Sequence, residues 1–201
     1  MSQLKSFLNH PYAFWALLSL PAVPMMAGLT SGAPSAVHDL LHPTGEFAAR
    51  FMVIAMMITP LMMLLKGWRG PRWLMQRRRH LGVAAFGYAA LHMVLYLVDE
   101  GVVAFTTSEL FKLSIWTGWL AFLIFVPLAI TSTEGWVRRL GPRWKPLQRC
   151  VYGAAVLTLL HWAALHDWGG IAPALVHFVP LALLEVYRVS SDVRRRQLRA
   201  A

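Results

Sequence analysis

Cysteine is nearly absent from this chain of 201 residues, occurring only at Cys150. A single cysteine excludes an internal disulfide, and the lack of CxxC and CxxCH motifs excludes a cysteine-ligated cluster and the usual covalent haem attachment. Any bound metal must therefore be held by histidine, methionine or carboxylate side chains. The sequence also lacks GxGxxG and other nucleotide fingerprints, so we expect any nucleotide-dependent reductase to be a separate partner.

Charge is scarce as well. Only 14% of the residues are charged and 57% are hydrophobic, whereas a soluble domain has about 25% charged and roughly 45–50% apolar residues. Too few charged side chains remain to cover the surface of a soluble domain. The formal net charge is +10, from 19 basic and 9 acidic residues. Arginines in the loops of a membrane protein explain this charge better than a nucleic-acid-binding surface does.

Long hydrophobic runs predict an all-α membrane bundle. A spanning helix needs about 20 mostly apolar residues, so we expect six transmembrane helices that form a single domain over residues 1–201. The first run is interrupted by Pro21 and Pro24, and with Lys5 before it also resembles a signal peptide, although we expect it to be retained. The six predicted spans are 12–28, 46–66, 80–98, 114–132, 147–165 and 171–188.

The basic residues alternate between the predicted loops and so predict a topology. Those of the second loop, the fourth loop and the tail at 189–201 fall on one side with Lys5, and six of the nine acidic residues gather on the other. By the positive-inside rule both termini are cytoplasmic, in a bacterial inner membrane. The arginines can also contact anionic lipid, and we expect no nucleic-acid partner because they flank spans. The basic set is Lys66, Arg69, Arg72, Arg77, Arg78, Arg79, Arg138, Arg139, Arg143, Lys145, Arg149, Arg188, Arg194, Arg195, Arg196 and Arg199, and the acidic set is Asp39, Glu46, Asp99, Glu100, Glu109 and Asp167.

Three histidines are predicted to lie at one depth in the membrane. Measured from the inner side, His92 lies about 18 Å along the third span and His161 about 21 Å along the fifth, while His177 lies about 9 Å below the outer surface. Two neutral imidazoles facing each other across a bundle can take both axial positions of a haem iron, which suits electron transfer rather than oxygen binding. We therefore predict that His92 and His161 are the axial ligands of a haem b.

The same histidines could also have other roles. An intramembrane histidine can be hydrogen-bonded across helices with no metal. His177 could bind a different partner, donate to a haem propionate or simply add polarity to the bundle. A second haem would need ligands at the inner ends of the same helices, where only His80 and Gln148 stand, and glutamine is a poor iron ligand. His80 points about 120° away from His92 on a regular helix, so we expect one haem. His80 is then left to be solvated at the membrane interface, or to contact propionates, a flavin phosphate such as that of FMN, or lipid.

Several motifs resemble those of one membrane family, the haem-binding membrane subunits of periplasmic methionine sulfoxide reductase systems (YedZ/MsrQ type). These subunits belong to the ferric-reductase-like transmembrane proteins. The resemblance covers roughly residues 40–188. The motifs that carry it are His42–Glu46, Arg50-Phe51, Thr59-Pro60, Arg79–His92, Leu128–Thr133, Leu140–Trp144, Val151-Tyr152 and Leu160–Trp162.

The resemblance implies a b-type haem protein that passes electrons from a cytoplasmic flavin reductase or quinone to a periplasmic molybdopterin enzyme that repairs oxidised methionine. It also implies that His92 and His161 match the family's haem histidines. Two positions depart from the family pattern: Gln148 stands where a further functional histidine is usual, and the sequence from Lys112 replaces an Arg-Pro-Tyr segment. These departures point to fewer haems or to a different electron acceptor.

The sequence therefore predicts an electron-transfer subunit without a complete active site of its own. Two other functions stay open at this point. One is a ferric or cupric reductase at the outer face, where His38, His42 and His166 would hold the incoming ion. The other is a non-redox transporter or assembly factor whose membrane histidines relay protons or bind lipid.

Overall fold

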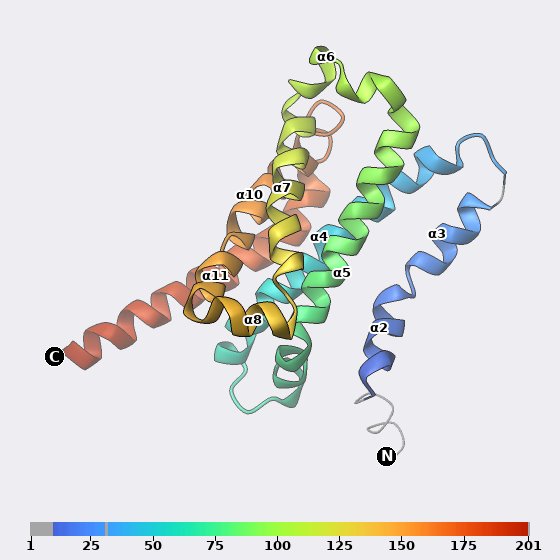
Figure 1. Ribbon diagram of the computed structural model, residues 1–201. Helices are drawn as coiled ribbons and strands as arrows, with labels where there is room; N and C mark the ends of the chain where they lie inside the picture. The colour runs from blue at the N-terminus through green and yellow to red at the C-terminus, as the bar shows by residue number, and fades with distance from the viewer. Residues whose placement is uncertain (1–9, 31, 201) are drawn as a thin grey trace.

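The structure is a computed structural model that describes residues 10–30 and 32–200. All regular secondary structure within these residues is helical (Figure 1). The predicted all-α class is therefore confirmed. Lys5, which the topology argument placed with the cytoplasmic basic residues, lies outside the described residues.

Four helices are long and apolar enough to cross a membrane. They are α4 (Ala36–Leu64), α5 (Arg69–Glu100), α7 (Leu113–Ile130) and α11 (Ile171–Ala200). Three of them extend beyond the predicted spans. The prediction used only runs of apolar residues, and these mark only the part of a helix that lies in the hydrophobic layer of the membrane. The arginine-rich start of α5 and the basic end of α11 continue as helix, since arginine is a good helix former.

The other two predicted spans differ from a straight spanning helix. Residues 12–28 form α2 (Pro11–Ser19) and α3 (Ala22–Leu29), which are bent by 49° at a short break. Pro21 lies at that break, where a proline removes a helical donor. Residues 147–165 are divided between α9 (Trp144–Gln148) and α10 (Val151–Ala163), and α10 has only 13 residues. The described helices therefore give four membrane spans, or five if the bent pair counts as one, and the prediction of six is not confirmed.

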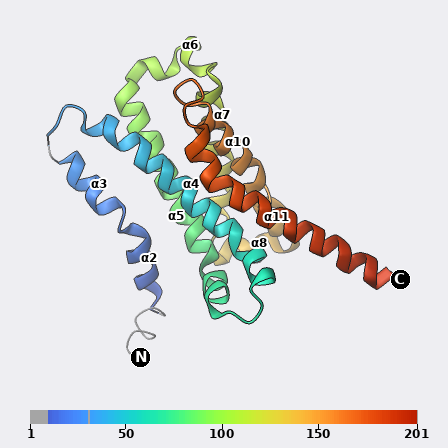
Figure 2. The same ribbon diagram turned by 180° about the vertical axis from the view of Figure 1, so that it is seen from behind.

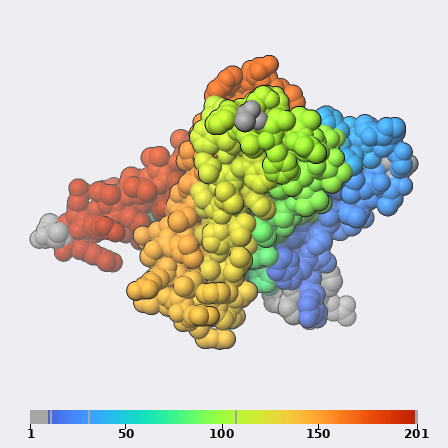
Figure 3. Space-filling view, turned by 45° about the horizontal axis from the view of Figure 1, so that its top comes forward, coloured from blue at the N-terminus to red at the C-terminus, as the bar shows by residue number. Residues whose placement is uncertain are grey.

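The long helices pack in two hairpins. Helix α4 packs against α5, α10 packs against α7, and α11 covers α4 and α10. Buried alanines on several helices, including Ala49, Ala85 and Ala154, allow the backbones to come close. The segment α2–α3 lies along the α4–α5 side of the bundle, and the end of α11 extends away from it (Figures 1 and 2). This protruding basic end also stands clear of the bundle in the space-filling view (Figure 3).

The two ends of the bundle differ in charge. One end carries the turns η1 (Gly101–Phe105) and α6 (Thr107–Leu110), and we call it the α6 end. The opposite end carries α8 (Glu134–Leu140), η2 (Gly141–Arg143) and the α4–α5 turn, and we call it the α8 end. Arginines 138, 139, 143 and 149 lie at the α8 end, and the acids Asp99, Glu100 and Glu109 lie at the α6 end. At the α8 end, Arg79 of α5 forms an ion pair with Glu134 of α8.

Candidate functional site

A cavity lies between the two hairpins, lined by residues of α4, α5, α7 and α10. Its empty volume is about 920 Å³, part of which is open to the surroundings. Cofactor and ligand sites in proteins are concave and have mostly apolar walls. The walls here combine small residues with aromatic ones, including Ala48, Ala49, Ala89, Ala121, Phe122 and Phe125. Its lining is therefore suited to an apolar cofactor.

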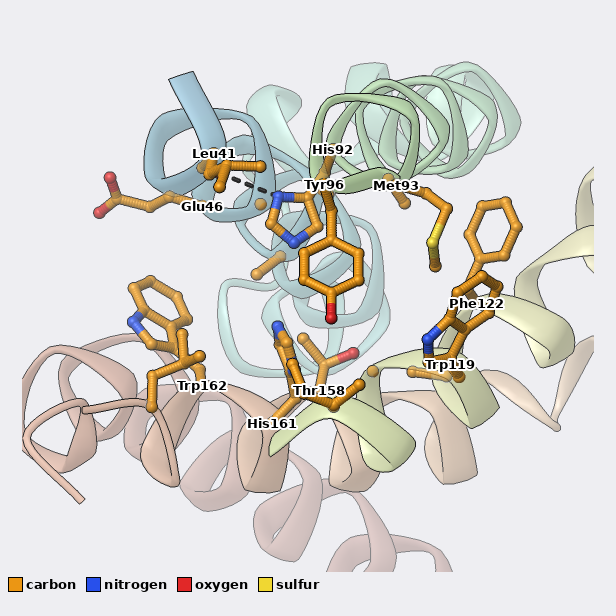
Figure 4. A pocket seen from close by; sticks show the side chains of 18 of the residues that line it. Leu41, Glu46, His92, Met93, Tyr96, Trp119, Phe122, Thr158, His161 and Trp162 are labelled. Carbon is orange, nitrogen blue, oxygen red and sulfur yellow. Dashed lines mark hydrogen bonds between the residues drawn. The ribbon is translucent and has the colours of Figure 1, made fainter. Parts of the chain in front are cut away.

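His92 of α5 and His161 of α10 face each other across this cavity (Figure 4). Their ring centres are 6.1 Å apart and their planes differ by 76°. If each imidazole nitrogen stands about 2.0–2.1 Å from one shared metal ion, the two ring centres are about 6 Å apart. The observed separation therefore leaves room for a single ion between the two histidines.

Backbone carbonyl groups fix the orientation of both rings. The Nδ1 of His92 donates to the carbonyl oxygen of Leu41 at 2.9 Å, and the Nδ1 of His161 donates to that of Ser114 at 2.5 Å. A carbonyl oxygen only accepts hydrogen bonds, so each Nδ1 carries the proton and each Nε2 is left unprotonated. This is the tautomer in which imidazole binds a metal, with the other nitrogen held by a neighbouring acceptor. Both rings are therefore prepared to coordinate through Nε2.

Two glycines make this arrangement possible, and the sequence analysis missed both. A Cβ atom on Gly118 would lie 2.7 Å from the Nδ1 of His161, closer than real Cβ contacts. A Cβ atom on Gly45 would lie 3.2 Å from the ring of His92. The available signal was a glycine inside each apolar helix, where glycine costs about 0.5–1 kcal/mol relative to alanine.

The structure does not bring His177 or His80 to this pair. The Nε2 of His177 accepts from the Nε of Arg50 at 3.2 Å, and its Nδ1 donates to the carbonyl oxygen of Pro173 at 2.8 Å. Both nitrogens of His177 are therefore occupied, and its ring packs against Trp162 outside the cavity. His80 packs against Phe14 and Trp15. It lines neither this cavity nor a second, smaller cavity nearer the α8 end.

A smaller cavity lies nearer the α8 end. Its empty volume is about 400 Å³, and Phe125 lines both cavities. Gln148 lines it, but the amide Nε2 donates to the carbonyl oxygen of Leu128 and to the hydroxyl of Thr131, both at 3.1 Å. No histidine is among the described residues that line it. The second cavity therefore lacks the imidazole pair of the first.

The histidines proposed to hold an incoming metal ion are not grouped. The Nδ1 of His38 lies 2.8 Å from the carboxylate of Asp99, and that of His42 lies 3.8 Å from Glu46. Across residues 10–30 and 32–200, no three His, Cys, Asp or Glu side chains are placed to hold a metal ion.

The chain is similar to a family of membrane proteins over most of this helical core. Residues 44–159 match the family described as ferric reductase like transmembrane component. Three relatives named protein-methionine-sulfoxide reductase heme-binding subunit MsrQ come from Azospira oryzae, Xanthomonas campestris pv. campestris and Rhizobium meliloti. The Azospira relative is 32% identical, over 90% of this chain and 79% of its own length. The Xanthomonas relative is 38% identical, over 82% of this chain and 74% of its own length. The Rhizobium relative is 34% identical, over 94% of this chain and 88% of its own length. No solved structure matches the chain.

Proposed function

Because the chain belongs to the ferric reductase-like transmembrane family, and within it to the MsrQ-type haem-binding subunits, we propose that it relays electrons through a membrane by one haem b held between His92 and His161. Several apolar helices make it a multi-pass membrane protein. In this proposal the donor is a cytoplasmic flavin reductase or a quinone. The acceptor is a periplasmic molybdopterin enzyme, and the names of the relatives support one that reduces methionine sulfoxide.

One observation carries the proposal. The two imidazoles stand 6.1 Å apart across an apolar cavity, with each Nδ1 committed to a backbone carbonyl. Bound there, the haem supplies a reversible one-electron iron couple. His92 and His161 would both hold the iron and would leave no coordination position for a substrate. The site therefore suits electron transfer rather than chemistry on a bound small molecule.

The residues of the chain keep this site rigid and dry. Each hydrogen bond from a histidine joins two helices, α5 to α4 through Leu41 and α10 to α7 through Ser114. The rings therefore keep their positions when the charge of the site changes. The apolar side chains of the cavity, such as Phe122 and Phe125, exclude water from the two coordinating nitrogens.

We propose one haem rather than two. The smaller cavity has Gln148 in place of a histidine, and two hydrogen bonds hold its amide on α7. We also keep six spans and two cytoplasmic termini in a bacterial inner membrane, with the α8 end at the cytoplasmic side and its arginines near anionic lipid. The gathering of basic residues at that end supports this orientation.

The first experiment measures haem in the detergent-purified chain. Oxidised and dithionite-reduced absorption spectra, with pyridine haemochrome quantification, are expected to give low-spin b-type bands at about one haem per chain, since one imidazole pair is present. His92→Ala and His161→Ala should each abolish or convert the low-spin bands. His10→Ala is the matched control, because His10 caps α2 away from the cavity. A folded wild-type chain without haem would refute the proposal.

The second part of the experiment tests the acceptor. The dithionite-reduced chain, freed of excess reductant, is mixed with a periplasmic molybdopterin methionine sulfoxide reductase and methionine sulfoxide. With a catalytic amount of enzyme, complete and rapid reoxidation of the haem bands is expected only when sulfoxide is also present, because two reduced haems are consumed for each sulfoxide. Equally rapid reoxidation by ferric citrate alone would favour direct metal reduction instead.

A further inference from the structure

The large cavity is polar at only one end. Toward the α8 end it is closed by alanines, Phe122 and Phe125, and by Thr158, whose hydroxyl donates to the carbonyl oxygen of Ala154 at 2.8 Å. Toward the α6 end the lining includes Tyr96, His42 and Glu46. A group with both apolar and charged edges would therefore have to turn its charged edge toward the α6 end.

Tyr96 has an unused donor at that end. It follows His92 by one helical turn on α5, and its ring reaches into the cavity toward α7 and α10 (Figure 4). Its hydroxyl is buried and has no hydrogen-bond partner among the described residues. A buried hydroxyl without a partner lowers stability, and such groups in folded proteins are normally satisfied. A ligand in the cavity is the natural source of the missing acceptor.

The acidic side chains nearest this end are partly neutralised by ion pairs. Glu46 also lines the cavity, but its carboxylate forms an ion pair with the Nη2 of Arg50. Arg50 in turn donates to His177, so its guanidinium is fixed one turn away from Glu46 on α4. The negative charge of Glu46 is therefore balanced. Of the two acids that act on Tyr96, Glu100 and Glu109, the second pairs with Lys112, so it repels an approaching carboxylate less than a free acid would.

We propose that the hydroxyl of Tyr96 donates a hydrogen bond to a carboxylate of the bound haem, which makes the α6 end of the cavity its carboxylate subsite. This inference rests on the proposed function, because haem b has two carboxylates on an otherwise apolar ring. It replaces the propionate contacts that the sequence suggested for His80 and His177. His80 lies outside the cavity, and both nitrogens of His177 have other partners. Tyr96 is a positioning residue, since it acts on the carboxylate edge and not on the iron.

The test uses the full-length holoprotein and the variant Tyr96→Phe, which removes only the hydroxyl. Tyr88→Phe is the matched control, because Tyr88 lies on the same helix but donates to the carbonyl oxygen of Leu18, at 3.1 Å, away from the cavity. Each protein is loaded with haem b and, separately, with haem dimethyl ester, in which the carboxylates are blocked. Haem transfer to excess apomyoglobin and the resonance Raman propionate bands are then measured.

With haem b, Tyr96→Phe should release haem about ten- to a hundredfold faster than wild type, since hydrogen bonds to charged groups are among the stronger ones. Its low-spin spectrum should persist and its propionate bands should shift. Tyr88→Phe should match wild type in all three. With the dimethyl ester, wild type and Tyr96→Phe should differ by less than about threefold, because a neutral acceptor forms a weaker bond.

Three results would overturn the inference. The first is an unchanged release rate and Raman spectrum in Tyr96→Phe. The second is an equal acceleration of release with the dimethyl ester. The third is loss of the low-spin spectrum in Tyr96→Phe, which would mean that the hydroxyl helps to hold the histidine ligands and not the carboxylate. Failure of the proposed function gives a different result, because the wild-type chain would then bind neither form of haem.

Discussion

Gly118 and Gly45 determine how closely a neighbouring helix can approach each imidazole. Without a side chain, the backbone of α7 lies directly against His161 and that of α4 against His92. The depth argument found both histidines because they fall at similar distances along two predicted spans. It could not find the carbonyl groups of Leu41 and Ser114, because every residue type carries a carbonyl group. The sequence thus identified the two rings that the structure brings together, while their role as haem ligands stays a prediction.

Gly118→Ala should disturb the site more than any other single methyl group added to these helices. The new Cβ would stand 2.7 Å from the Nδ1 of His161, so the ring must move and its hydrogen bond to Ser114 must lengthen. We expect loss of the low-spin haem spectrum with helix content unchanged by circular dichroism. Gly45→Ala, at 3.2 Å from His92, should have a smaller effect.

Gly87→Ala serves as the control for this prediction, since nothing lies within 4 Å of its added Cβ. It should keep the haem and stabilise α5 by about 0.5–1 kcal/mol. Full haem content with an unchanged spectrum in Gly118→Ala would show that His161 does not need the close approach of α7.

At the scale of elements, hydrophobicity predicted four long helices but not their ends. Apolar residues define the part of a helix inside the membrane, whereas a helix can continue into the interface as long as its backbone remains hydrogen-bonded. This explains why α4 begins at Ala36 and α5 at Arg69, ten or more residues before the predicted spans. Helix α10 is short for a different reason. The apolar run from 147 to 165 includes the turn at Arg149 and Cys150, which apolarity alone does not reveal.

The ion pair between α5 and α8 predicts a pH effect. The hydrogen bond and the charge of Arg79 lower the pKa of Glu134 below its ordinary value of 4.5. A carboxylate with a lowered pKa in the folded state stabilises that state above its ordinary pKa, and the contribution is lost as the pH falls through the lowered value. Both side chains are exposed, so a small effect confined to α8 is expected.

Hydrogen–deuterium exchange of residues 134–140, corrected for the intrinsic rate, tests this prediction. Protection of α8 should decrease as the pH is lowered from about 6 to about 3, a range that spans the ordinary pKa of Glu. Glu134→Gln, which keeps the size of the side chain, should show no such decrease. The same pH dependence in both proteins would place its origin in another group.

At the scale of the whole molecule, the sequence predicted an all-helical membrane protein but could not fix the number of spans. Residue counts do not reveal that 12–28 bends by 49° or that α10 has 13 residues. These features depend on how Pro21 and the turn at Arg149 pack within the bundle. Sidedness came from charge alone, and it stays a prediction.

The only cysteine offers a direct test of sidedness. Cys150 is exposed at the α8 end, which the positive-inside rule places in the cytoplasm. A membrane-impermeant maleimide should therefore label it in inverted vesicles and not in intact spheroplasts. The control is the double variant Cys150→Ala, Ser108→Cys, in which the new thiol lies in α6 at the opposite end. It should label in spheroplasts, and the reverse result for both proteins would invert the topology.

The division of the site among four helices also has a consequence for biogenesis. His92 is held by a carbonyl of α4, and His161 by a carbonyl of α7. The first hairpin is complete long before the ribosome has made α10, and until then His92 faces a cavity with no opposite wall. The chain must therefore be translated through residue 161 before both imidazoles exist together. If the two histidines hold the cofactor as proposed, its capture is a late step that joins two hairpins and not an event that helps the first hairpin to form.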